Sequence, residues 1–100
     1  MVEDAFVSNL LRAILQRAGH CVTCESPDAA AGRLRSGKVD LLITNTPTAF
    51  AEFGQTVPLL YLAAFPDPEA AADFERWLAL RKPFQTTELL AQAGRLLGTV

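Results

Sequence analysis

The sequence predicts an α/β domain built on a doubly wound parallel sheet, and three observations support this prediction. Apolar runs alternate with amphipathic stretches along all 100 residues. Two of the runs, 40–44 and 58–64, are apolar on successive residues, which is typical of strands covered by helices on both faces. Polar residues follow several runs, at the strand ends where such sheets bind ligands. Residues 1–100 are therefore expected to form one domain.

The first half of the chain carries clear helix boundaries. Apolar residues repeat at helical spacing from Phe6 to Ala18, and Gly19 offers a left-handed end to that helix. A short strand is predicted from Cys21 to Cys24. The tripeptide Ser-Pro-Asp at 26–28 then supplies a cap, a first helical proline and an acidic first turn. This second helix is expected to reach about Ser36.

The second half continues the alternation. Its elements are predicted in this order: a strand at 40–44, one helical turn at 48–53, a strand at 58–64, a helix from Pro66 to about Arg76 or Trp77, a strand at 78–81, and a helix capped by Thr86 or Thr87 that ends at Gly98. Glu88 supports that last cap. Phe50 and Phe53 in the short helical turn are expected to pack in the core. Most of the other aromatic residues are expected to pack there or between helices and sheet: Tyr61, Phe65, Phe74, Trp77 and Phe84.

Composition excludes several classes of protein. Half of the residues are hydrophobic and 20% are charged, as in ordinary globular chains. The formal net charge of −2 argues against nucleic-acid binding. No apolar run approaches the roughly 20 residues that cross a bilayer, and the acidic start lacks the features of a signal peptide. We expect neither a nucleic-acid nor a membrane partner, and a cytoplasmic location.

The two cysteines have the C-x-x-C spacing of redox and metal sites. A reactive pair needs this spacing at the start of a helix, whereas Cys21 and Cys24 fall on the predicted strand. Residues three apart on a strand point to opposite faces. We therefore expect two ordinary strand residues and no redox or zinc function.

A set of segments, taken in order, carries a resemblance to a known family. The segments are Val2-Glu3-Asp4, Ala18-Gly19-His20, residues 37–44, Val57-Pro58-Leu59-Leu60 and Lys82-Pro83-Phe84. Together they resemble the receiver domain of response regulators, the CheY-like family. The resemblance implies a three-layer, flavodoxin-like fold with a five-stranded parallel sheet in the order 2-1-3-4-5. Against that pattern the first strand is truncated to Met1 and Val2, and the third helix is shortened.

The resemblance also assigns a phosphorylation site. In the family, an acidic pair and an aspartate hold magnesium, and the aspartate accepts the phosphoryl group; Glu3 and Asp4 match the pair, while Asn45 replaces the acceptor. Lys82 matches the lysine that contacts the phosphoryl group. From the residues alone, the acidic pair could equally be solvated charges at a helix entrance or partners of Lys82 in an ion pair. No cofactor is expected, because two carboxylates bind magnesium only weakly.

Two further family positions lack their functional groups. The hydroxyl residue that binds the phosphoryl oxygens falls at Ala63, and the aromatic switch falls at Ala79. The family's usual docking face would include Ala79, Arg81 and Phe84.

These substitutions predict a stand-alone pseudo-receiver of bacterial signal transduction. It would act through protein–protein interaction, with another signalling protein or with itself as a homodimer, independently of aspartyl phosphorylation and without enzymatic activity. One alternative is a metal-dependent phosphoacceptor that uses Glu3 or Asp4 as an unconventional acceptor. Another is a small-ligand module at the strand ends, in a cleft left by the shortened helix.

Overall fold

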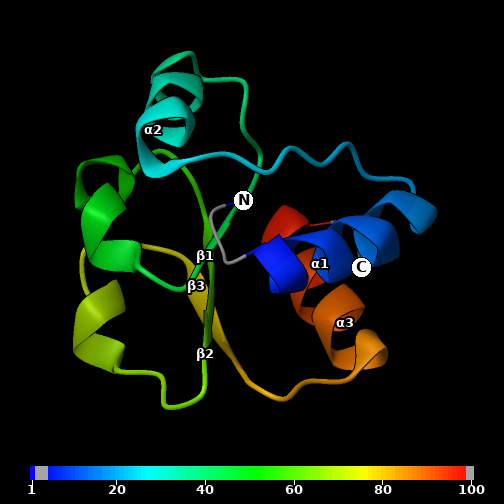
Figure 1. Cartoon of the computed structure of the whole chain (residues 1–100). Helices are drawn as coiled ribbons and strands as arrows, with labels where there is room; N and C mark the ends of the chain where they lie inside the picture. The colour runs from blue at the N-terminus through cyan, green and yellow to red at the C-terminus, as the bar shows by residue number, and fades with distance from the viewer. Residues whose placement is uncertain (2–4, 99–100) are drawn as a thin grey trace.

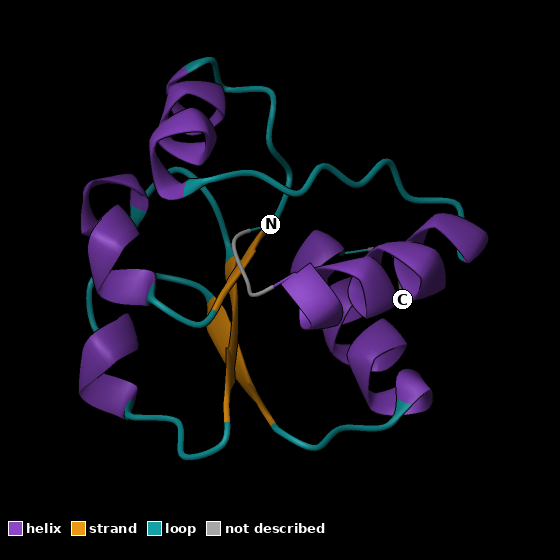
Figure 2. Ribbon diagram, viewed as in Figure 1, coloured by secondary structure: helices purple, strands orange, loops and turns teal. Residues whose placement is uncertain are grey.

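The structure is a computed structural model and describes residues 1 and 5–98. In chain order the elements are α1 (Ala5–Arg17), α2 (Pro27–Arg35), β1 (Leu42–Thr44), the 3₁₀ helix η1 (Pro47–Phe53), β2 (Leu59–Ala63), the 3₁₀ helix η2 (Pro68–Ala71), β3 (Trp77–Arg81) and α3 (Thr86–Leu97) (Figure 1). The three strands are parallel, in the order β1-β2-β3. Helices α1 and α3 lie on one side of the sheet, and α2 with both 3₁₀ helices lies on the other (Figure 2).

The helix boundaries follow the signals in the sequence. Gly19 and Gly37 have φ of +97° and +75°, the left-handed conformation that glycine adopts without steric cost. At the start of α2, the backbone N–H of Ala29 donates to the Ser26 hydroxyl at 3.4 Å. The cap of α3 lies one residue earlier than predicted, at Gln85, whose N–H donates to Glu88 Oε1. None of the helices that the structure describes is long and apolar enough to cross a membrane.

The sheet separates two apolar cores. The core under α1 and α3 is built from residues such as Leu11, Leu60 and Leu89, all fully buried. The core on the opposite face contains Phe50 and Phe53 of η1, which are 1% and 6% exposed. The prediction that these two phenylalanines pack in the core is confirmed. Because both faces of β2 are covered, its residues are apolar in succession.

The predicted strand from Cys21 to Cys24 does not form. That segment is extended, and two hydrogen bonds join its end to Met1: the Met1 amino group donates to Thr23 O at 2.8 Å, and the Glu25 N–H donates to Met1 O at 3.1 Å. Burial lowers the pKa of this amino group. Within the described residues the sheet has three strands, whereas the resemblance implies five.

The predicted helix from Pro66 to about Arg76 is also wrong. Only the short η2 forms, although the alanine-rich sequence favours a helix. The chain leaves the helical path after η2 because Phe74, 4% exposed, enters the core and the Glu75 N–H donates to Gly54 O at 3.1 Å. Strand β3 then begins at Trp77, where Leu59 N–H pairs with Arg76 O. Tertiary packing outweighs local propensity here.

Candidate site at the carboxyl ends of the strands

The carboxyl ends of the three strands bring Asn45, Ala63 and Lys82 to one edge of the sheet. Asn45 directly follows β1, Ala63 ends β2, and Lys82 directly follows β3. The Lys82 N–H donates to Ala63 O at 2.9 Å, so these two residues are neighbours. Thr44 lies opposite Tyr61 in the sheet, which places Asn45 beside the end of β2. Asn45 is exposed, whereas Ala63 and Lys82 are half-buried.

A turn at the end of β1 fixes the backbone that carries Asn45. Thr44 is fully buried, and its hydroxyl oxygen accepts the N–H of Thr46 at 3.0 Å. The two threonine hydroxyls also lie 3.2 Å apart. Pro47, which is buried, then begins η1. The role of Thr44 was not predicted from the sequence, although a threonine hydroxyl that accepts the N–H two residues later is typical of such side-chain turns.

The chemistry of this edge is limited by its side chains. The amide of Asn45 is uncharged and a very poor nucleophile, so it neither attacks a phosphoryl group nor supplies charge to a cation. Ala63 offers a methyl group where a hydroxyl would be needed to hold phosphoryl oxygens. Lys82 is the cationic side chain at this edge, and a lysine ammonium acts as a point charge toward anions. The edge therefore supplies no acceptor group at 45 or 63.

Glu3 and Asp4, which match the magnesium-binding acidic pair of the family, lie outside the described residues. Within the part of the chain that the structure describes, no group of three or more His, Cys, Asp or Glu side chains is arranged to hold a metal ion. The small-ligand alternative placed a cleft at this same edge. A cavity of about 330 Å³ lies elsewhere: it is lined by the segments 20–25 and 38–43 and by residues of α1, α2 and α3, and Asn45, Ala63 and Lys82 are not among its lining residues.

The predicted interaction face is partly exposed. Ala79 and Arg81 on β3 are exposed, whereas Phe84 is half-buried against the core under α1 and α3. Phe65, in the loop after β2, is 82% exposed, although the aromatic residues were expected to pack in the core. The Arg81 guanidinium lies 5.5 Å from the centre of the Phe65 ring, and its Nε donates to Ala64 O at 3.1 Å. We call Phe65, Ala79 and Arg81 the β3 face.

The loop after β2, which contributes Phe65 to the β3 face, is bonded to a side chain of β2. The Tyr61 side chain is buried, and its hydroxyl accepts the N–H of Asp67 at 3.4 Å. The sequence contains a signal for the exposure of Phe65: this residue follows the apolar run and precedes Pro-Asp-Pro, a sequence typical of a surface loop. An aromatic residue that lies outside the periodic run has no sheet neighbour to cover it.

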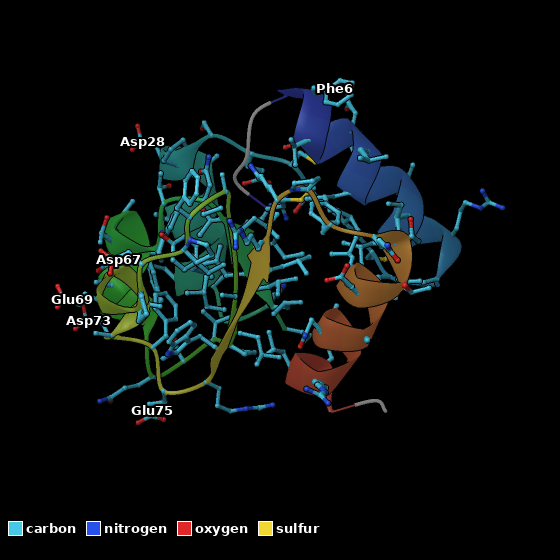
Figure 3. The ribbon with its side chains drawn as sticks, turned by 90° about the horizontal axis from the view of Figure 1, so that it is seen from below. Phe6, Asp28, Asp67, Glu69, Asp73 and Glu75 are labelled. Atoms are coloured by element: carbon cyan, nitrogen blue, oxygen red, sulfur yellow. The ribbon has the colours of Figure 1, made fainter. Side chains whose placement is uncertain are left out.

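Negative charge gathers beside the β3 face. The segment 67–75 contains four exposed carboxylates and no basic residue. Figure 3 shows Asp67, Glu69 and Asp73 projecting outward on the same side of the molecule, with Glu75 below them, whereas Phe6 lies far away on α1. The acidic segment begins two residues after Phe65, so the exposed ring adjoins carboxylates along the chain.

The two cysteines are free. Cys21 is exposed, and Cys24 is half-buried with its Sγ 3.8 Å from the backbone oxygen of Ser8. They lie on the extended segment between α1 and α2, at neither helix start. A redox or metal role has no support in this arrangement.

Comparison with known proteins gives structural relatives only. No protein-family model matches the sequence, and no curated protein matches it significantly. A candidate response regulator from Chloroflexus aurantiacus J-10-fl has a TM-score of 0.77 at 24% identity, over 97% of this chain and 95% of that one. The signal receiver domain of an HD domain-containing protein from Pseudomonas fluorescens Pf-5 has a TM-score of 0.74 at 22% identity, over 97% and 84% of the two chains.

A third structure places the same fold in a larger protein. NtrX from Brucella abortus, solved in complex with ADP, has a TM-score of 0.78 at 18% identity over 98% of this chain, which spans only 25% of that protein. The matches cover nearly the whole of the present chain in each case, at identities that establish fold rather than activity. The chain therefore has the α/β fold of response-regulator receiver domains, with a parallel sheet and helices on both of its faces.

Proposed function

We propose that this chain is a receiver-like signalling module that works by binding another protein and not by accepting a phosphoryl group on an aspartate. The observation that carries the proposal is the strand-end edge: Asn45 and Ala63 occupy the positions where the family has its acceptor and its hydroxyl. We further propose that the module acts in the cytoplasm of a bacterium and has no enzymatic activity; the support for this is its receiver fold, which it shares with a candidate response regulator and a signal receiver domain.

The β3 face is the surface that we propose for the partner. Phe65 is a large exposed ring held by Arg81, and aromatic and arginine side chains are the residues that most often anchor protein interfaces. The acidic segment 67–75 beside it favours a partner with a basic surface. A partner of this kind would seat Phe65 in an apolar pocket and place lysines or arginines opposite the carboxylates. A second copy of this chain, which is acidic at the same place, fits less well.

The first test measures phosphorylation directly. The protein is incubated with acetyl phosphate and magnesium and analysed by intact mass spectrometry at neutral and acid pH. We expect no acid-labile adduct on the wild-type protein. A stoichiometric adduct would refute the proposal, and its site would tell the alternatives apart: an adduct on Glu3 or Asp4 would support the unconventional phosphoacceptor instead.

Two variants calibrate this test. Asn45→Asp restores a carboxylate at the strand end, and we expect it to increase magnesium affinity while phosphorylation stays slow, because Ala63 still lacks a hydroxyl. Asn45→Asp combined with Ala63→Thr supplies both groups and should give the larger amount of adduct. Full phosphorylation and a conformational change of Asn45→Asp alone would contradict the proposal that Ala63 and Ala79 prevent a phosphate-driven switch.

The second test concerns the interaction surface. Crosslinking and affinity capture are compared between the wild-type protein, Phe65→Ala and Arg81→Glu, with Arg12→Glu on α1 as a charge-matched control away from the face. We expect the two β3-face variants to lose the same captured protein that wild type and Arg12→Glu retain. Equal capture by all four proteins would exclude the β3 face. Sedimentation over a range of concentrations measures self-association separately.

A further inference from the structure

Strand β3 lies at one edge of the sheet, and β2 is its only partner strand among the described residues. The Leu59 N–H donates to Arg76 O at 3.0 Å, and the Lys82 N–H donates to Ala63 O at 2.9 Å. The backbone groups at both ends of β3 that belong to even-numbered residues therefore point toward β2. Because the direction of these groups alternates along a strand, the even-numbered residues between them also bond to β2.

The odd-numbered residues of β3 direct their backbone groups outward. They are Trp77, Ala79 and Arg81, each of which carries one N–H donor and one C=O acceptor. None of these groups has a backbone hydrogen-bond partner within the residues that the structure describes. Ala79 and Arg81 are exposed, and the Arg81 side chain is bonded to Ala64 O in the loop after β2. We call these backbone groups the outer edge of β3; such an edge is a template for a further strand.

The face of the sheet that carries α3 is apolar beside this edge. Leu78 and Leu80 both pack in the core under α1 and α3. Leu60, which lies opposite Leu78 on β2, is fully buried, whereas Leu78 itself is half-buried. Apolar surface therefore remains on this face where the sheet ends, and an apolar side chain of an added strand would cover it.

The other face, which carries η2, is acidic. Trp77 packs against the core on this side, so the alternation of side chains places Ala79 and Arg81 on this side as well. The segment 67–75 includes η2 and ends two residues before β3, and its four exposed carboxylates are accompanied by no basic residue. Basic side chains of an added strand would complement this charge.

We propose that the outer edge of β3 receives one extended strand of the partner protein, in which apolar and basic side chains alternate. The proposal rests on the function proposed above, since it uses the same face and adds the form of the partner. An extended backbone presents donors and acceptors at the interval at which Trp77, Ala79 and Arg81 present theirs, whereas the backbone groups of a helix bond to one another. Strand β3 of a second copy would offer one basic side chain on the required face, Arg81, which is already bonded to the loop after β2.

The first test uses a synthetic peptide and two backbone-blocked controls. The probe is acetylated and amidated Lys-Val-Lys-Val-Lys-Val-Lys; one control carries methyl groups on the amide nitrogens of two inner lysines, and the other carries them on those of two valines. An extended peptide turns these two sets of nitrogens to opposite edges, so one control should bind at least about tenfold more weakly and the other should bind like the probe. Retention by both controls, or loss by both, would overturn the proposal, because an added strand uses only one of its own edges.

Amide exchange locates the bound probe on the protein. We expect the probe to slow exchange at Trp77, Ala79 and Arg81 by about tenfold or more, and to affect Leu78 and Leu80 less because they are already bonded to β2. Slowing confined to other amides would refute the proposal. Slowing at the same three amides without peptide, increasing with protein concentration, would assign the outer edge to a second copy and would likewise overturn it.

Protein variants test the hydrogen bonds and the charges separately. Ala79→Pro removes an outward N–H at a kind of position where edge strands tolerate proline, and it should lose probe binding while circular dichroism shows it folded; the methylated peptides test the same bonds if it does not fold. Asp73→Asn with Glu75→Gln should weaken probe binding by about threefold or more. Asp28→Asn with Glu52→Gln removes the same charge elsewhere, and equal binding by the two double variants would refute the basic character of the strand.

The results also separate this proposal from the function on which it rests. If Phe65→Ala and Arg81→Glu lose the captured protein but no probe binds up to its solubility limit, strand addition is refuted and the β3 face stands. If the probe protects the outer edge while both variants keep the captured protein, strand addition is supported and the β3 face is excluded as the surface for that captured protein.

Discussion

Gly54 offers a sharp test of the packing that shapes the β3 side of the domain. A Cβ atom at this position would lie 1.8 Å from Asp73 O and 2.6 Å from Asp73 C, whereas real Cβ atoms stay at least 3.0 Å from such neighbours. Both are backbone atoms, so the chain must move. The backbone at Gly54 has φ of −59°, which any residue adopts, so conformational preference plays no part. Gly54→Ala isolates the steric effect.

The expected cost follows from what the movement disturbs. Overpacking of this kind costs about 1–3 kcal/mol, and displacement of Asp73 weakens the Glu75 N–H to Gly54 O hydrogen bond, worth about 1 kcal/mol. We therefore expect Gly54→Ala to lower the free energy of unfolding by about 2–4 kcal/mol, out of the roughly 5–15 kcal/mol typical of a domain. Urea denaturation followed by the fluorescence of Trp77 measures this loss.

Gly32→Ala is the matched control. Gly32 lies in α2, and a Cβ there would meet nothing within 4 Å. The substitution should stabilise the protein by about 0.5–1 kcal/mol, because alanine favours the helix and restricts the unfolded chain. If the free energy of unfolding of Gly54→Ala lay within about 0.5 kcal/mol of the wild-type value, Gly54 and Asp73 would not lie as close as described. That result would also contradict the explanation given for the short η2.

Three further substitutions test single contacts. Arg76→Ala should cost about 1 kcal/mol in urea denaturation, because Arg76 donates to Leu96 O at 2.9 Å and satisfies the carboxyl end of α3; a neutral result would contradict this cap. Thr44→Val should cost about 1–2 kcal/mol, since the Thr46 N–H loses its acceptor, and amide exchange at Thr46 should accelerate. Phe65→Ala should change the free energy of unfolding in urea by no more than about 0.5 kcal/mol, because the ring is 82% exposed; a large loss would mean that it packs in the core.

The sequence predicted those features that depend on residues close together in the chain. Gly19, Gly37 and the Ser26 cap act within a few residues of the helices that they bound, so local patterns located them. The apolar runs likewise located β1 and β2, because burial on both faces leaves a continuous signature. The resemblance to receivers placed Asn45, Ala63 and Lys82 at one edge, and the sheet register brings them there.

The failures involve distant contacts. The segment 68–75 has strong helical propensity, but contacts with Gly54, about twenty residues earlier, determine its path. The Glu75 N–H donates to Gly54 O, and the Asp73 backbone lies close to Gly54; a local sequence pattern predicts neither contact. The segment from Cys21 to Cys24 is extended as predicted, yet it is not a strand. A strand needs a neighbouring strand to pair with, and a local sequence pattern does not predict that neighbour. Exposure of Phe65 was missed for the same reason: burial is a property of neighbours across the fold.

The strand-end edge depends on contacts that do not involve the side chains at 45 and 63. The contact that joins Lys82 to Ala63 uses backbone atoms, and the turn before Asn45 depends on Thr44, so the edge needs neither a carboxylate at 45 nor a hydroxyl at 63. A phosphate-driven switch would also need a side chain on β3 that moves between two positions. Ala79 has only a methyl group, and Arg81 is held by Ala64 O and the Phe65 ring. A surface with one arrangement suits constitutive binding, and its affinity for a partner should be the same with and without acetyl phosphate.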